Sequence, residues 1–257
     1  MRKHLWTRDE FMIVFNLYLK IPFGKMYSTN PDVKRVAALI GRTAGSIAFR
    51  LGNFASCDPI LKQRGIKGLT GGSKQCQPYW DQFLADKDKF IFESEQILAR
   101  YQKISLESKY KKLLFDISND LTGEDKERVV KTRVNQNVFR AIILANYDST
   151  CALSGIDIPE LLVASHIIPW ADNKEERLNP ENGICLSSLY DKAFDQGLIT
   201  FSDDYKTILS SKIKANVGKT YYADFFEPFE GKQLLNPEKY FPNKRFLEYH
   251  RDVIFIS

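Results

Sequence analysis

The stretch Cys151–Thr200, CALSGIDIPELLVASHIIPWADNKEERLNPENGICLSSLYDKAFDQGLIT, decides the fold of the second half of the chain. An apolar run leads to His166 and stops at Pro169, which is typical of a strand that ends in a turn. Asn182-Gly183 is a tight-turn signal, and a second apolar stretch follows it. From Ser188 onward the apolar spacing becomes helical. The stretch therefore predicts a strand, a turn, a second strand and a short helix.

Polar side chains gather where these predicted elements meet. His166 lies at the end of the first strand, and Asp191 and Asp195 lie one helical turn apart on the short helix. A neutral imidazole can accept a proton near pH 7, and carboxylate oxygens are ligands for Mg²⁺ or Mn²⁺. The pattern predicts a general base beside one divalent ion.

The same stretch resembles the HNH, or ββα-metal, nucleases. The residues that carry the resemblance are SHIIPW, NG-x-x-L and KAFDQGLIT, a pattern found in a branch whose members often act as restriction endonucleases. It continues upstream through Lys131–Gln136, Phe139-Arg140 and Tyr147, and so covers roughly half of the chain. It implies a ββα-metal domain that hydrolyses phosphodiester bonds of double-stranded DNA with Mg²⁺ or Mn²⁺ and leaves 5′ phosphate ends.

The resemblance suggests roles for three residues. His166 corresponds to the general base that activates water. Asn182 either ties the loop together through side-chain to backbone hydrogen bonds or is a plain Asn-Gly turn residue, and we favour the first. Asp191 falls where the family places its last histidine or asparagine, so it is expected to hold the metal ion.

Two features of the sequence leave the metal ligands unassigned. An alternative alignment puts Tyr190, and not Asp191, at the last motif position. Ser165 stands where many HNH enzymes have Asp or His as the other metal ligand. A water, a backbone carbonyl, Asp195 or Asp157 could take that place, or the site could be weakened.

The cysteines do not form the zinc site that many HNH domains carry. Its two C-x-x-C pairs would be Cys151 with Ser154 and Cys185 with Ser188, so half of each pair is missing and a four-sulfur site is excluded. The chain's 4 cysteines show no disulfide pattern, which favours a reducing, cytoplasmic compartment. No stretch reaches the roughly eighteen apolar residues of a membrane helix, so no membrane partner is expected.

The first half of the chain is expected to be helical. Thr7 and Glu10 form a capping box that starts a helix. Asn30-Pro31 starts a second helix, which Gly41 ends, and a third helix follows Arg42-Thr43. The string ALIGRTAGSIAFRLGNF resembles the last two helices of Myb-like helix-turn-helix modules. On that interpretation the residues that face DNA are Arg42, Thr43, Ser46, Arg50 and Asn53. The alternative is a structural helical bundle with a solvated face.

Charge adds further candidates for contact with nucleic acid. The net charge of +5 and the pI near 8.8 permit DNA binding without requiring it. Arg140 and Lys192 are candidate phosphate contacts, or ordinary surface charges. The basic, glycine-rich segment 58–73 is predicted to be a mobile loop suited to phosphate, or a plain surface loop. His250, in the C-terminal tail, is expected at a surface or an interface.

These observations lead to one main hypothesis and two alternatives. We expect an α+β protein with a helical, helix-turn-helix-like DNA-recognition domain (1–117), a linker (118–130) and an HNH nuclease domain (131–257) with its core at 151–200. The hypothesis is a metal-dependent, restriction-type DNA endonuclease, which would cut both strands as a homodimer. The alternatives are a modification-dependent or other HNH nuclease, and a DNA-binding regulator whose nuclease site has decayed.

Overall fold

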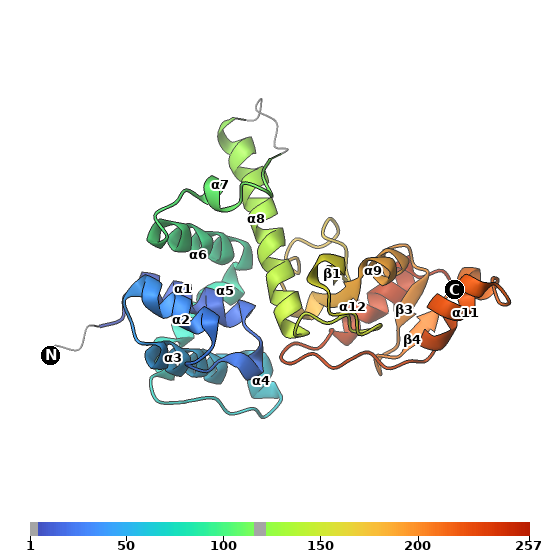
Figure 1. Cartoon of the computed structure of the whole chain (residues 1–257), viewed down its shortest axis with the longest axis horizontal. Helices are drawn as coiled ribbons and strands as arrows, with labels where there is room; N and C mark the ends of the chain where they lie inside the picture. The colour runs from blue at the N-terminus through green and yellow to red at the C-terminus, as the bar shows by residue number, and fades with distance from the viewer. Residues whose placement is uncertain (1–4, 116–121) are drawn as a thin grey trace. The chain divides into compact units, whose positions relative to one another are not determined.

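The structure, a computed structural model, describes residues 5–115 and 122–257. Its internal contacts divide the chain into two compact units, Met1–Ile142 and Ile143–Ser257. The division falls within α8 (Gly123–Asn146), the long helix near the middle of Figure 1. Helices and two small antiparallel sheets make the fold α+β. Across the described ranges, every helix is too short or too polar to cross a membrane.

The segment predicted as a linker, 118–130, is partly helical. Residues 118–121 lie outside the described residues, whereas the part from Gly123 to Val130 belongs to α8. Val130 and Val134 are buried against Phe92 in a small hydrophobic cluster. This burial joins α8 to the N-terminal unit from Val130 onward, and the second part of the predicted linker is helical. The predicted domain boundaries stay a proposal.

The N-terminal unit is a bundle of helices in which α1 (Arg8–Lys20) is central. All of its residues from Glu10 to Leu19 are buried, which is expected of a helix enclosed on every side. The other elements appear from blue to green in Figure 1. They are α2 (Pro31–Ile40), α3 (Ala44–Cys57), α4 (Pro59–Gln63), α5 (Gln77–Ala85), α6 (Lys87–Tyr101), α7 (Leu106–Lys109) and the short 3₁₀ turns Phe23–Lys25 and Ser73–Gln75.

An aromatic cluster forms the core of this unit. The ring of Phe15 on α1 lies 4.9 Å from the rings of Phe54 on α3 and Trp80 on α5, and 5.0 Å from Phe90 on α6. These edge-to-face contacts are the arrangement that aromatic quadrupoles favour. Each of the three partner helices therefore packs on α1 through an aromatic side chain.

The predicted helix boundaries in this unit are confirmed. Thr7 and Glu10 make both bonds of the capping box at α1. The Asn30 side chain caps α2, and Gly41 ends that helix with a φ of 69°. The Thr43 side chain accepts a hydrogen bond from Ser46 N and so starts α3. The helix-turn-helix interpretation of α2 and α3 stays a prediction.

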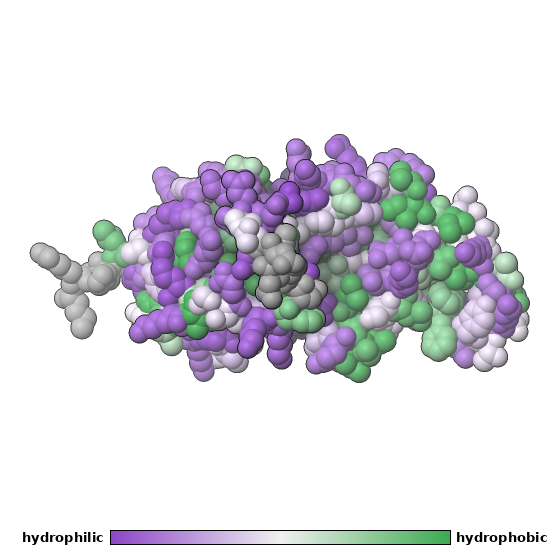
Figure 2. Space-filling model, turned by 90° about the horizontal axis from the view of Figure 1, so that it is seen from above, coloured by the Kyte–Doolittle hydropathy of each residue, from purple (hydrophilic) through white to green (hydrophobic). Residues whose placement is uncertain are grey.

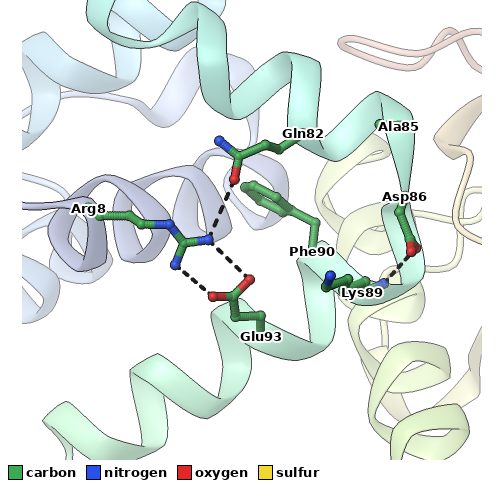
Figure 3. A pocket seen from close by; sticks show the side chains of 7 residues that line it. All are labelled: Arg8, Gln82, Ala85, Asp86, Lys89, Phe90 and Glu93. Atoms are coloured by element: carbon green, nitrogen blue, oxygen red, sulfur yellow. Dashed lines mark hydrogen bonds and ion pairs between the residues drawn. The ribbon is translucent and has the colours of Figure 1, made fainter.

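A polar bridge joins α1 to α5 and α6 at the edge of a cavity of about 290 Å³. Figure 3 shows Arg8 reaching Glu93 with two hydrogen bonds, of 2.6 and 3.1 Å, while the same guanidinium approaches Gln82. Because the Arg8 charge is matched by Glu93, we interpret this cavity as part of the scaffold. The face drawn in Figure 2 is mostly hydrophilic over the N-terminal unit, at the left, whereas hydrophobic patches reach the surface of the C-terminal unit.

The C-terminal unit is organised around a strand pair and one helix. Strands β1 (Leu162–His166) and β2 (Gly183–Ser187) are antiparallel, and α9 (Ser188–Asp195) packs on both. A second pair, β3 (Ile199–Phe201) and β4 (Thr207–Leu209), forms the hairpin after α9. The predicted order of strand, strand and helix is confirmed. The remaining elements are α10 (Ser211–Lys214), α11 (Thr220–Phe225), α12 (Lys244–Tyr249), a π-helical turn (His250–Ile254) and the 3₁₀ turns Pro159–Leu161, Pro180–Asn182 and Glu227–Phe229.

The C-terminal segment is joined to the end of α9 through Gly197. Gly197 has a φ of +64°, and a Cβ placed there would overlap the carbonyl oxygen of Ile254. The Gly197 carbonyl also accepts a hydrogen bond of 2.9 Å from Ile256 N. Glycine is required here for two reasons, because the backbone is left-handed and another main chain lies against it.

Candidate functional site

The ends of β1 and α9 enclose a pocket of about 420 Å³ in the C-terminal unit. His166 is the last residue of β1 and pairs with Gly183, the first residue of β2. Asp191 and Asp195 line the same pocket from α9. Because α9 follows β2 directly, the local order of elements brings a histidine and two carboxylates from separate parts of the sequence to one place.

The orientation of the His166 ring is set by a backbone carbonyl. Its Nε2 lies 2.9 Å from the carbonyl oxygen of Arg177. A carbonyl can only accept, so Nε2 carries the proton and Nδ1 carries the lone pair of the neutral ring. Burial lowers the pKa of His166, and the nearby Arg177 charge lowers it further, although the hydrogen bond to the Arg177 carbonyl opposes both. The ring is therefore neutral near pH 7 and can accept a proton at Nδ1.

Trp170 and Arg177 support this histidine, and the sequence reasoning missed both. The Trp170 and His166 rings meet edge to face with their centroids 5.4 Å apart. The Arg177 guanidinium lies 5.1 Å from the Trp170 ring centre and donates a 2.6 Å hydrogen bond from Nε to the Trp170 carbonyl. The tryptophan that follows Pro169 in the quoted motif was an available signal. No sequence signal pointed to Arg177, because its main contact with His166 is made by its backbone carbonyl and not by its side chain.

Asn182 joins the two ends of the loop that connects β1 with β2. Its side chain is 1% exposed. Oδ1 accepts a 2.8 Å hydrogen bond from Ile168 N, and Nδ2 donates bonds of 3.1 Å to the carbonyls of Ile168 and Glu176. All of its described partners are backbone atoms of the loop. This geometry holds the segment that carries the Arg177 carbonyl close to His166.

The two carboxylates of α9 form an electrostatically unfavourable pair. Burial raises the pKa of Asp191 to about 6, the negative charge of Asp195 adds to the rise, and Ser165 and Lys192 oppose it. Burial also raises the pKa of Asp195, against the nearby Lys192 charge. Like charges one helical turn apart disfavour ionisation, and a cation between them would relieve that cost.

The donor atoms around this pair suit a hard divalent ion. Ser165 Oγ is buried and lies close enough to Asp191 to lower its pKa, but it reaches hydrogen-bond geometry with no described atom. Among the described residues, no group of three His, Cys, Asp or Glu side chains converges on one point. Two carboxylates and a hydroxyl fit Mg²⁺ or Mn²⁺, which bind few protein oxygens and keep several waters, better than Zn²⁺.

Tyr190 and Asp191 point in different directions from α9. Tyr190 is 5% exposed, and its hydroxyl donates a 3.0 Å hydrogen bond to the carbonyl of Phe225. Its ring packs against Phe229 at 4.9 Å. Asp191 lines the pocket and Tyr190 does not. The helical spacing predicts one apolar side of α9 with Leu189, Ala193 and Phe194. Ala193 and Phe194 are buried, but Leu189 is 46% exposed and Tyr190 is buried in its place, so this prediction is partly wrong.

The residues at the positions of the family's zinc pairs are joined by hydrogen bonds. Cys151 and Cys185 are both buried. Cys151 Sγ accepts hydrogen bonds of 3.3 Å from Ser154 N and 3.1 Å from Ser187 N. Ala152 N donates a 2.7 Å bond to the carbonyl of Cys185. Backbone hydrogen bonds thus join the two segments.

His250 is buried, so the expectation of a surface histidine is wrong. It is 1% exposed and stacks on Phe194, with ring centroids 3.7 Å apart. Nε2 donates to the Phe194 carbonyl at 3.1 Å, and Nδ1 then accepts from the Thr200 hydroxyl at 2.9 Å. Burial lowers the pKa of His250 to about 4. His250 lines the pocket, but both of its ring nitrogens are used inside the fold.

Two of the predicted DNA-reading residues of α3 do not point outward. Arg50 and Asn53 are 6% and 0% exposed, so that part of the prediction is wrong. Asn53 Nδ2 donates to the carbonyls of Leu69 and Gly71 at 2.7 and 2.8 Å. The helical spacing placed Arg50 and Asn53 correctly on one face. The loop after α4 returns along that face and covers it.

The other predicted DNA contacts have varied surroundings. The Arg42 guanidinium is paired with Glu10 at 2.8 Å and lies over the Trp6 ring. Thr43 is exposed at the start of α3, and Ser46 is half-buried. In α8 Arg140 is half-buried, and in α9 Lys192 is exposed beside the two carboxylates. Whether any of them contacts DNA stays a prediction.

Comparison with known proteins agrees with this geometry. The family model described as HNH endonuclease matches residues 151–202, which span β1, β2, α9 and β3. The match covers the whole of the pocket's first strand and helix, including His166, Asn182 and Asp191. A search of curated proteins found no match. Residues 151–202 of this chain therefore form a domain of the HNH endonuclease family.

Proposed function

We propose that this protein is a divalent-metal-dependent DNA endonuclease whose active site is the pocket between β1 and α9. The observation that carries the proposal is the Nε2–Arg177 hydrogen bond, which assigns the lone pair of His166 to Nδ1, in a pocket that two carboxylates also line. Hydrolysis of a phosphodiester requires an activated water and neutralisation of negative charge, and a positioned neutral imidazole and an oxygen-rich cation site can supply them.

Each residue of the pocket has a distinct part in this mechanism. His166 Nδ1 takes the proton of the attacking water, while the Arg177 carbonyl and the Trp170 ring keep the imidazole oriented. Asp191 and Asp195 would hold Mg²⁺ or Mn²⁺, with Ser165 Oγ directed toward the same site. A bound ion would neutralise charge on the phosphate and on the leaving 3′ oxygen. Lys192, exposed beside the carboxylates, is proposed to contact a neighbouring phosphate.

The finer assignment is a restriction-type enzyme, and it rests on the SHIIPW and KAFDQGLIT pattern. One such site per chain cuts one strand, so cleavage of both strands is proposed to use a homodimer. A protein that stays monomeric on DNA and only nicks it would exclude the dimer. Selective cleavage of methylated DNA would replace the restriction role with a modification-dependent one.

The proposed activity is tested by cleavage of supercoiled and linear DNA, methylated and unmethylated, in Mg²⁺ or Mn²⁺. His166→Ala is compared with the wild type, and His250→Gln serves as a control histidine, because His250 is held by Phe194 and Thr200. We expect His166→Ala to lose cleavage and keep DNA binding, whereas His250→Gln retains measurable cleavage. Equal cleavage by wild type and His166→Ala refutes the assignment of the base. Tight binding without cleavage by the wild type would indicate a DNA-binding regulator.

A further inference from the structure

A run of basic residues without acidic neighbours lies between α3 and α5. No Asp or Glu occurs between Asp58 and Asp81. The segment 62–74, here called the basic loop, contains four cations, all of them on exposed residues: Lys62, Arg64, Lys67 and Lys74. Salt bridges found within the described residues do not include the three lysines. Such a segment has an excess of positive charge that a polyanion would neutralise.

The basic loop is fixed to α3 by buried polar side chains. Asn53 Nδ2 donates to the carbonyls of Leu69 and Gly71, and Arg50 Nη1 lies 3.3 Å from the Gly72 carbonyl. The main chain adds a 3.1 Å hydrogen bond from Leu69 N to the Gly52 carbonyl. The expectation of a mobile loop does not fit these contacts. Side chains of α3 hold the loop in one conformation.

Gly68 lets the loop lie directly on the helix. A Cβ at this position would overlap Ser56 N and would lie 2.7 Å from the Gly52 carbonyl oxygen. In Figure 1 the loop after α4 runs beside α3. A side chain at Gly68 would have to lift the loop from α3, because both contacts are with main-chain atoms, which cannot rotate away.

Burial of Arg50 and Asn53 is costly unless their polar groups are paired. Carbonyls of the basic loop accept from Arg50 Nη1 and Asn53 Nδ2, while Arg50 Nε reaches no described hydrogen-bond partner and the guanidinium lies over the Trp6 and Phe11 rings. Holding four cations on an ordered backbone lowers the entropy that is lost when they bind a regular array of phosphates. Two exposed apolar residues, Phe49 (48%) and Leu69 (49%), lie on α3 and on the loop. Phe49 contacts the loop near Gly71, where a Cβ would be 3.7 Å from its ring.

We propose that the basic loop is the surface through which the N-terminal unit contacts the backbone of double-stranded DNA, and that Arg50 and Asn53 position it. This inference rests on the proposed function, which makes DNA the ligand. In this proposal the second half of α3 does not itself contact DNA in the way that the sequence predicted for Arg50 and Asn53. It holds the basic loop, and the loop contacts DNA. The contact is with phosphates and carries little sequence information.

The first test measures the salt dependence of binding. Full-length protein is titrated onto a labelled 30-base-pair DNA duplex in EDTA, so that no cleavage occurs, at several salt concentrations. The variant Lys62→Ala/Lys67→Ala/Lys74→Ala is compared with the charge-matched control Lys89→Ala/Lys111→Ala/Lys112→Ala, whose lysines lie elsewhere in the unit. If each loop lysine neutralises one phosphate, the negative slope of log K against log salt becomes smaller in magnitude by about 2.7 in the loop variant. A slope equal to that of the control overturns the proposal.

The second test moves the loop without a change in charge. Gly68→Ala is compared with Gly45→Ala, which lies on α3 where a Cβ meets nothing within 4 Å. We expect Gly68→Ala to reduce both the affinity, by at least tenfold, and the salt slope, while its circular dichroism stays that of the wild type. Gly45→Ala should bind like the wild type. If Gly45→Ala loses as much affinity as Gly68→Ala, the helix surface is the contact and the positioning role is wrong.

Cleavage assays separate this inference from the proposed function. If the wild type and the triple-lysine variant differ in salt slope as expected but the wild type does not cleave DNA, the result supports the basic loop and refutes the endonuclease. A wild type that cleaves, with the triple-lysine variant equal to it in salt slope, supports the endonuclease and refutes the loop. Absence of DNA binding by the wild type at low salt refutes both.

Discussion

Replacement of the carboxylate of Asp191 should stabilise the metal-free protein while it removes the proposed activity. Burial and the Asp195 charge raise the pKa of Asp191 from 3.8 to about 6. A shift of this size corresponds to about 3 kcal/mol of unfavourable free energy for the ionised carboxylate in the folded state. The side chain is half-buried, and after a discount for solvent screening we expect Asp191→Asn to raise the unfolding free energy by about 1 to 2 kcal/mol at pH 7.5.

The same pKa shift predicts how the stability of the metal-free protein changes with pH. Between pH 3.8 and about 6 the unfolded chain has released the Asp191 proton and the folded chain still holds it. Stability of the metal-free wild type therefore falls as pH rises through this window and levels off above it. Asp191→Asn lacks this contribution, so the two proteins should converge in stability as the pH approaches 4.

The assay is thermal unfolding in EDTA and in excess Mg²⁺ at pH 4.5, 5.5 and 7.5. In EDTA at pH 7.5 we expect the melting temperature of Asp191→Asn to exceed that of the wild type by about 2 to 8 °C. Mg²⁺ should raise the melting temperature of the wild type more than that of the variant, because binding to the folded state adds stability. Asp157→Asn, an exposed carboxylate of the same unit, is the control. A variant that is less stable than the wild type in EDTA at pH 7.5 refutes the reasoning.

Three further substitutions probe the supports of the site. Asn182→Ala removes the side-chain partners of the buried Ile168 N–H and carbonyl, while the Glu176 carbonyl keeps its bond from Asn179 N. We expect a loss of about 2 to 4 kcal/mol of unfolding free energy in denaturant titrations, and a loss below 0.5 kcal/mol would contradict the role of Asn182 in holding the loop. Burial lowers the pKa of His250 to about 4, so the wild type should lose stability as pH falls from 6.5 toward 4. His250→Gln should weaken this dependence of stability on pH, and an unchanged dependence would contradict the assignment to His250. Gly197→Ala should lower the melting temperature more than Gly155→Ala, since both glycines have positive φ but only the first meets the Ile254 carbonyl; equal effects would mean that backbone strain alone decides.

Local sequence signals predicted the elements of both units well. The capping box at Thr7, the left-handed Gly41 and the apolar run before His166 each act within a few residues, so they could be identified without a tertiary model. For the same reason the order of β1, β2 and α9 followed from the alternation of apolar residues and the change to helical spacing at Ser188.

What the sequence by itself determined is the set of elements and the chemical types at their ends: a histidine after a strand and two carboxylates one turn apart on a helix. The tertiary structure alone decided which partners these groups meet. The Arg177 carbonyl sets the His166 tautomer, Tyr190 turns into the core, and His250 is enclosed by α9 and β3. The basic loop covers Arg50 and Asn53, which a helical pattern assigns to solvent. These contacts join residues far apart in the chain, and periodicity within one element carries no information about which distant segment packs on its face.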